Sequence, residues 1–202
     1  MPRAFISLPA LPPLLPALLA MLDAGKALDV AKDVRWERAG QLHLTLSFLG
    51  EQPLPRLRQL VHTLQATYAD QPPVRLRLTG AGCFPPKGAP RVIYAGVDGG
   101  DPLLGLAACT KQAAKVCGIT IDTKQSGSFT AHITLGRVRE VADPARALAL
   151  ATSLKEMPAA SVEQTASEAL IMLSELRPTG AVHSVYARLP FDRGVVLASS
   201  RE

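Results

Sequence analysis

Two short segments of the sequence repeat one pattern, and each contains a histidine. Residues 42–46 read Leu-His-Leu-Thr-Leu, and residues 131–135 read Ala-His-Ile-Thr-Leu. The chain has four histidines in 202 residues, and these segments hold two of them, His43 and His132. An imidazole titrates near pH ~6.5, so at neutral pH one histidine can accept a proton while another donates one. The pair is therefore a candidate for general acid–base catalysis.

Each histidine is followed at the second position by a threonine, Thr45 or Thr134. Side chains alternate faces along a strand, so each histidine shares a face with its threonine while the leucines or isoleucine between them enter a core. The two copies lie 89 positions apart (43 to 132), close to half of the chain, which suggests a pseudo-twofold arrangement around one cleft.

Two such His/Thr pairs suit the hydrolysis of a phosphodiester by in-line displacement. One imidazole removes a proton from the attacking water, and the other protonates the departing oxygen on the opposite side. The threonine hydroxyls can donate hydrogen bonds to the non-bridging phosphate oxygens, and a nearby arginine can offset their charge. Of the two remaining histidines, we expect His62 on the polar face of a helix and His183 as a candidate for the pocket edge.

Composition and cysteine usage narrow the function classes. The chain is 48% hydrophobic and 19% charged, which excludes a disordered protein, and its net charge of +5 favours an anionic partner. The three cysteines, Cys83, Cys109 and Cys117, form no CxxC pair and have no histidine at ligand spacing. We therefore expect no metal site and no disulfide framework, only reduced thiols.

The apolar N-terminal stretch, residues 4–22, could resemble a signal peptide, but four prolines interrupt it. Such proline density suits neither an uninterrupted signal sequence nor a membrane helix. A strand followed by a proline-opened helix fits better, and we expect a cytoplasmic protein without a membrane segment.

The rest of the chain alternates predicted strands and helices. Apolar runs predict strands at 4–8, 41–49, 74–79, 91–97, 131–138, 169–176 and 182–189, and proline-opened patterns predict helices at 13–27, 51–69, 101–118 and 145–155. Hairpin-like neighbours such as 74–79 with 91–97 argue for antiparallel sheets, and no glycine-rich phosphate loop is present. The sequence therefore predicts an α+β fold rather than a doubly wound one.

Longer stretches around both motifs resemble a known family. Residues 42–51 (LHLTLSFLGE) and 129–138 (FTAHITLGRV) are similar to the HxTx motifs of the two-histidine phosphoesterase superfamily. Residues 3–8 (RAFISL), 35–36 (RW), 173–176 (LSEL) and 180–182 (GAV) narrow the resemblance to the RNA 2′,3′-cyclic phosphodiesterases of the LigT-like group. The resemblance spans nearly the whole chain. His183 stands where that family commonly has an aromatic residue.

The resemblance implies one two-lobed domain over residues 1–202, in which two antiparallel sheets with outer helices enclose a cleft. It implies hydrolysis of a 2′,3′-cyclic phosphate on an RNA end or a nucleotide to a 2′-phosphomonoester, with no cofactor and no metal. His43 would be the proton donor and His132 the proton acceptor, while Thr45 and Thr134 would hold phosphate oxygens. We expect a monomer.

Two further residues are expected at the site only if a strand departs from regular alternation. Arg137 lies five positions after His132, so a regular strand would place it on the opposite face. A bulge or strand end would be needed to bring it to the phosphate. Phe48 stands in the same relation to His43 and is a candidate for the pocket edge or for the core.

Other functions remain open at this stage. A reversible 2′–5′ RNA ligase would use the same groups with a 5′-hydroxyl RNA end in place of water. A non-catalytic module that binds RNA ends would keep the cleft, although binding alone does not need two titratable groups. An unrelated α+β domain with coincidental motifs is the remaining alternative.

Overall fold

The computed structural model describes residues 1–28, 32–121, 129–139, 143–155, 162–177 and 180–191. The elements in chain order are β1 (Arg3–Pro9), α1 (Leu15–Ala27), β2 (Val34–Trp36), a 3₁₀ turn η2 (Ala39–Gln41), β3 (His43–Glu51), α2 (Leu54–Thr67), β4 (Val74–Phe84), β5 (Val92–Asp98), α3 (Gly100–Val116), β6 (His132–Val138), α4 (Pro144–Lys155), β7 (Glu163–Ala166), β8 (Glu168–Arg177) and β9 (Gly180–Pro190).

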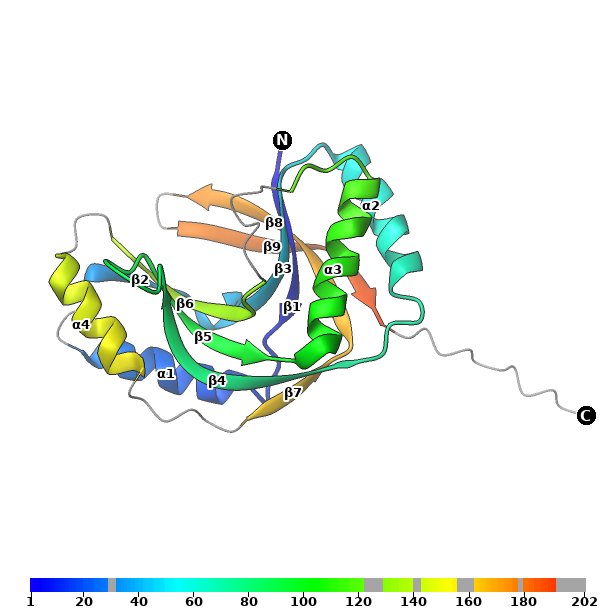
Figure 1. Ribbon diagram of the computed structural model, residues 1–202. Helices are drawn as coiled ribbons and strands as arrows, with labels where there is room; N and C mark the ends of the chain where they lie inside the picture. Colours follow the sequence, from blue (N-terminus) through cyan, green and yellow to red (C-terminus); the bar gives the residue numbers. More distant parts are fainter. Residues whose placement is uncertain (29–31, 122–128, 140–142, 156–161, 178–179, 192–202) are drawn as a thin grey trace, which may run out of the picture.

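All strand pairs in the described residues are antiparallel, and they form one curled sheet with the order β7-β4-β5-β6-β3-β1-β8-β9, with β2 also pairing β6 (Figure 1). The sheet divides into two halves. The His43 half consists of β3, β1, β8 and β9, and the His132 half consists of β6, β5, β4 and β7 with β2. The α+β class and antiparallel pairing predicted from the sequence are confirmed.

The two halves meet at a single register pair. Leu44 of β3 lies opposite Ile133 of β6, and both side chains are about 1% exposed. The two antiparallel sheets expected from the sequence are thus continuous through one residue pair. Leu44 follows His43 and Ile133 follows His132, so this junction fixes the two motifs side by side.

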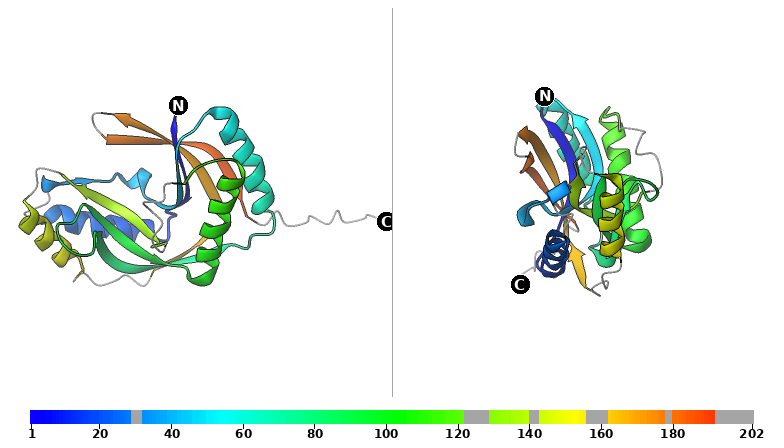
Figure 2. Two further views of the ribbon diagram at one scale, coloured as in Figure 1. Left: turned by 45° about the horizontal axis from the view of Figure 1, so that its top comes forward. Right: turned by 90° about the vertical axis from the view of Figure 1, so that its left-hand side faces the viewer.

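Helices pack on both ends of the curled sheet. Figure 1 and Figure 2 show α2 beside α3 at one end and α1 near α4 at the other. Buried leucines of α2 (Leu57, Leu60 and Leu64) lie in the same core cluster as the strands. No helix in the described part of the chain is long and apolar enough to cross a membrane.

Gln164 of β7 ties the two halves together at a second place. Its Oε1 accepts a hydrogen bond from the Leu11 N–H at 2.7 Å, and its Nε2 donates to the Pro9 carbonyl at 2.9 Å. The side chain is only 3% exposed. β7 belongs to the His132 half, whereas Pro9 ends β1 of the His43 half, so this buried amide is a second link between the halves.

The helix boundaries agree with the sequence patterns to within three residues, although Glu51, expected at the start of a helix, is the last residue of β3. An aspartate directly before a proline, at 101–102 and at 143–144, predicts a helix N-cap. Asp143 does cap α4, since its Oδ1 accepts from the Ala145 N–H at 2.8 Å. The expected cap at Asp101 is wrong, because α3 begins one residue earlier and Asp101 lies within its first turn. Gly99 is the N-cap residue of α3, and Asp98, directly before it, accepts a hydrogen bond through its Oδ1 from the Gly100 N–H at 3.0 Å. Gly118 ends α3 with φ +69°, as expected for a residue after a helix C-cap.

The sequence patterns do not predict two of the strands, β2 and β7. Each is short, with three and four residues respectively, so alternation has too few positions to show. β2 matters for the site, because it pairs with the end of β6 and brings Arg35, with Glu37 directly after the strand, to the wall of the cleft described below.

Candidate active site

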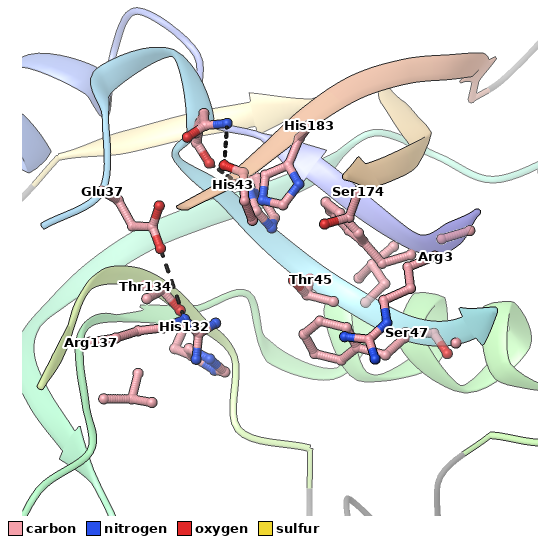
Figure 3. Close-up of a pocket in the computed structure, with 18 of the residues that line it drawn as sticks. Arg3, Glu37, His43, Thr45, Ser47, His132, Thr134, Arg137, Ser174 and His183 are labelled. Atoms are coloured by element: carbon pink, nitrogen blue, oxygen red, sulfur yellow. Dashed lines mark hydrogen bonds and ion pairs between the residues drawn. The ribbon is translucent and has the colours of Figure 1, made fainter. Parts of the chain in front are cut away.

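A cleft of about 1090 Å³ lies between the two halves, and the two motifs face each other across it. Figure 3 shows His43 and Thr45 on one strand and His132, Thr134 and Arg137 on the strand opposite. The cleft wall also includes Phe48 and His183, so every site residue named from the sequence lines it.

The two histidines are held in the same way. The Nδ1 of His43 lies 2.6 Å from the carbonyl oxygen of Gln41, and the Nδ1 of His132 lies 2.8 Å from that of Thr130. A carbonyl oxygen only accepts, so each Nδ1 must carry the proton and donate it. The neutral ring then has its lone pair on Nε2, which can take a proton from water or, once protonated, give one to a leaving oxygen.

Each histidine also packs against aromatic rings. Phe5 stacks on His43 at 4.8 Å between ring centroids, and His183 meets His43 edge-on at 5.5 Å. Phe84 and Tyr94 contact His132 at 5.0 and 5.3 Å. These contacts restrict the rotation of both imidazoles.

The same packing depresses the basicity of the imidazoles. Burial lowers the pKa of His43 to about 4, and the nearby His183, His132 and Arg137 act in the same direction. Burial also lowers the pKa of His132, to which Arg137 adds. Both rings are thus neutral at pH 7 before an anion binds. A bound phosphate anion would act in the opposite direction and raise both pKa values.

A bulge in each motif strand decides the positions of Arg137 and Phe48. Along β6, Ile93 of β5 pairs with Gly136 and Tyr94 pairs with Thr134, so Leu135 is an extra residue in the ladder. Along β3, Ser7 pairs with Thr45 and Ile6 with Ser47, so Leu46 is the extra residue there. An extra residue reverses the alternation that follows it.

Arg137 and Phe48 consequently face the cleft instead of the opposite side of the sheet. Arg137 contributes to the cleft wall, and its charge lowers the pKa of all three cleft histidines. Phe48 is 40% exposed and lies 6.2 Å from Phe5 between ring centroids. The core alternative for Phe48 is therefore wrong, because the bulge at Leu46 turns its ring outward.

The remaining two histidines differ in environment. His62 is exposed on α2, as the sequence predicts. His183 lies at the cleft wall, packed edge-on against both Phe5 and His43. Burial lowers the pKa of His183, and Arg137 adds to this effect.

The cleft also holds charged residues that the motifs did not reveal. Glu37, next to β2, lies 4.0 Å from the Nε of Arg137 through its Oε1. Burial raises the pKa of Glu37, while Arg137 and Arg35 oppose that rise. Further cations on the wall are Arg3, Arg35, Arg38 and Lys111. Arg3 and Phe5 lie two positions apart on the first strand, so their side chains point to the same face, the one that β1 turns to the cleft. This spacing in the sequence could have identified Arg3.

In the described residues, no three histidine, cysteine, aspartate or glutamate side chains cluster as metal ligands. All three cysteines are free, and none of them lines the cleft.

Comparison with known proteins agrees with this arrangement. The family described as LigT-like phosphoesterase matches residues 13–94 of the chain. An RNA 2′,3′-cyclic phosphodiesterase of Thermus thermophilus is 36% identical over 161 residues, which cover 72% of this chain and 69% of that relative. The chain belongs to the LigT-like phosphoesterase family. It is accordingly a hydrolase.

Other relatives of this LigT-like phosphoesterase carry the same description. An RNA 2′,3′-cyclic phosphodiesterase of Thermotoga maritima is 27% identical over 80% of this chain and 81% of that relative. Among solved structures, TT0787 of Thermus thermophilus superposes with a TM-score of 0.75 at 26% identity, covering 94% of this chain and 97% of that one. The fold of Escherichia coli LigT is also similar, with a TM-score of 0.70 at 22% identity over 95% of this chain and 99% of that one.

Proposed function

We propose that this LigT-like phosphoesterase hydrolyses 2′,3′-cyclic phosphates, at RNA ends or on nucleotides, to 2′-phosphomonoesters by acid–base catalysis without a metal ion. One observation carries the proposal: two histidines from the two halves of the sheet have the same tautomer, fixed by the carbonyls of Gln41 and Thr130, and line one cleft. The names of the relatives supply the substrate class.

In the proposed reaction the cyclic phosphate lies between the two motifs. The Nε2 of His132 takes a proton from water as its oxygen attacks phosphorus, and the P–O3′ bond breaks. The Nε2 of His43 gives a proton to the departing 3′ oxygen, so the phosphate remains on the 2′ oxygen. His132 leaves the step protonated and His43 leaves it neutral. A proton exchange with solvent then restores both rings.

The threonines and Arg137 stabilise the charge that develops. Thr45 and Thr134 line the cleft, each two positions after its histidine, and their hydroxyls can donate to the two non-bridging oxygens. Arg137 supplies positive charge beside His132, and its contact with Glu37 at 4.0 Å leaves it able to turn toward an anion. The assignment of His43 as acid and His132 as base follows the family resemblance.

The experiment is a product analysis with purified protein, EDTA and a cyclic mononucleotide or a short RNA with a 2′,3′-cyclic end. The proposal expects the 2′-phosphate, identified by its ³¹P shift, and undiminished turnover in EDTA. A 3′-phosphate product, or a requirement for added metal, would contradict it. Adding an RNA with a 5′-hydroxyl end tests the ligase alternative, since a ligase would join the two ends with a 2′–5′ linkage.

A further inference from the structure

Three polar residues of the His43 half form a row across neighbouring strands. Arg3 of β1 lies directly opposite Ser174 of β8, and Ser174 lies opposite His183 of β9. Directly opposed residues on antiparallel strands point to the same face. All three line the cleft, and Figure 3 shows them on the side of His43, away from His132 and Arg137.

The chemistry of this row suits an anion. It offers a guanidinium, a hydroxyl and an imidazole, all of which can donate hydrogen bonds. The Nδ1 of His183 is buried and has no hydrogen-bond partner within the described part of the chain. The neighbouring carboxylate is Glu51, whose Oε1 lies 3.6 Å from the Nε of Arg3, and the side chain of Arg3 is 56% exposed. Such an exposed pair is weak, and a phosphate can compete with it.

The geometry of in-line displacement indicates which part of a substrate would reach this row. The attacking water and the leaving 3′ oxygen lie on opposite sides of phosphorus. If His132 activates water and His43 protonates the 3′ oxygen, the ribose must lie on the His43 side. The 5′ oxygen of that ribose, and the phosphodiester attached to it in RNA, then extend into the His43 half.

We propose that Arg3, Ser174 and His183 form a second phosphate subsite, which binds the phosphodiester on the 5′ side of the nucleotide that carries the cyclic phosphate. This inference rests on the proposed function. It makes a cyclic-phosphate RNA of two or more nucleotides a better substrate than a cyclic mononucleotide, which has no such phosphodiester.

The order of residues along β1 and β3 matches the order of groups along RNA. Thr45 pairs with Ser7, Phe48 pairs with Phe5, and Arg3 pairs with Glu51 at the far end. Ser7 and Arg3 are four positions apart on β1, which corresponds to roughly 13 Å along a strand at 3.3 Å per residue. The exposed ring of Phe48 therefore lies between the motif residue Thr45, where the reacting phosphate would bind, and the guanidinium of Arg3. A nucleoside separates successive phosphates of RNA in the same way.

The test compares kcat/KM for a 2′,3′-cyclic mononucleotide with kcat/KM for the dinucleotide that ends in the same cyclic nucleotide. For wild-type protein we expect a clear preference for the dinucleotide. In Arg3→Gln the ratio of the two values should fall about tenfold, because a charged hydrogen bond to phosphate is lost. Ser174→Ala and His183→Phe should lower the ratio too. The salt dependence of the dinucleotide reaction should also weaken, by a slope of about 0.7 per lost phosphate contact.

Two control variants make the outcome specific. Arg75→Gln removes an exposed arginine of β4 that does not line the cleft, and it should leave the ratio unchanged. Arg35→Gln removes a cation on the β2 side of the cleft. An unchanged ratio in both Arg3→Gln and Arg3→Ala would overturn the inference, as would a ratio that falls in Arg35→Gln instead. If wild-type protein hydrolyses neither substrate, the proposed function itself fails.

Discussion

Leu46 and Leu135 occupy equivalent places in the two halves of the molecule, because each is the residue bulged from its ladder directly after the threonine of a motif. Both leucine side chains are buried, at 2% and 0% exposure. The bulges have the same consequence in both halves. The residue five positions after each histidine, Phe48 or Arg137, returns to the cleft face.

The first prediction concerns Arg137. Arg137→Gln should weaken inhibition by inorganic phosphate by at least about tenfold, since a charged hydrogen bond to phosphate is worth roughly 1.5–3 kcal/mol. Inhibition constants measured at one pH and ionic strength check this. Arg139→Gln, an exposed arginine two positions further on, is the matched control and should change little. Equal inhibition of wild type and Arg137→Gln would remove Arg137 from the phosphate site.

The second prediction concerns stability at acid pH. The pKa of His43 is about 4 in the folded chain and near 6.5 when unfolded, so below pH 6.5 the unfolded state binds more protons. Stability should fall as the pH drops from 6.5 to 4, by about 3 kcal/mol from this histidine. Denaturant unfolding at both pH values checks it. His43→Gln should lose correspondingly less stability over this range than wild type or His62→Gln, and equal losses in all three would contradict the prediction.

The third prediction follows from the same pKa values. An imidazole that is neutral at pH 7 must gain a proton before it can act as the acid, and a bound phosphate anion favours that gain. Binding of inorganic phosphate at pH 7 should therefore take up protons. Calorimetric titration in buffers of different ionisation enthalpy measures the number taken up. Binding should lose part of this uptake in His43→Gln, and a wild-type enthalpy that does not depend on the buffer would count against the mechanism.

The fourth prediction concerns the link between the halves. Gln164→Leu leaves the Leu11 N–H and the Pro9 carbonyl without their buried partner, at a cost of about 1–3 kcal/mol in the free energy of unfolding. Urea denaturation checks this value. Thr165→Ala changes the adjacent, exposed residue of β7 and should alter stability by less than about 0.5 kcal/mol. An equal loss of stability in both variants would contradict the role of Gln164 as a link between the two halves.

The two motif strands and the paired placement of the histidines could be predicted from the sequence, because alternation and repetition are local properties. The single joint between Leu44 and Ile133 could not, since register between strands far apart in the chain depends on the whole sheet. The sequence indicates only that a bulge or a strand end is needed to bring Arg137 to the cleft. It does not locate the bulges at Leu46 and Leu135. No local pattern in either motif marks an extra residue.

The residues missed from the sequence share a physical reason. Arg3, Ser174 and Glu37 lie on strands or turns that carry no repeated motif, and they reach the cleft through tertiary pairing. The fixed tautomers of His43 and His132 depend on main-chain carbonyls two residues earlier, and a side-chain pattern does not report those.

The most direct test of the acid and base roles uses a cyclic substrate whose 3′ oxygen is replaced by sulfur. A thiolate leaves without protonation, so the acid becomes dispensable while the base does not. We predict that His43→Ala loses at least ~10²-fold in kcat on the oxygen substrate and recovers most of that loss on the sulfur substrate, whereas His132→Ala loses similarly on both. The opposite pattern, or full activity of either variant on the oxygen substrate, would contradict the account.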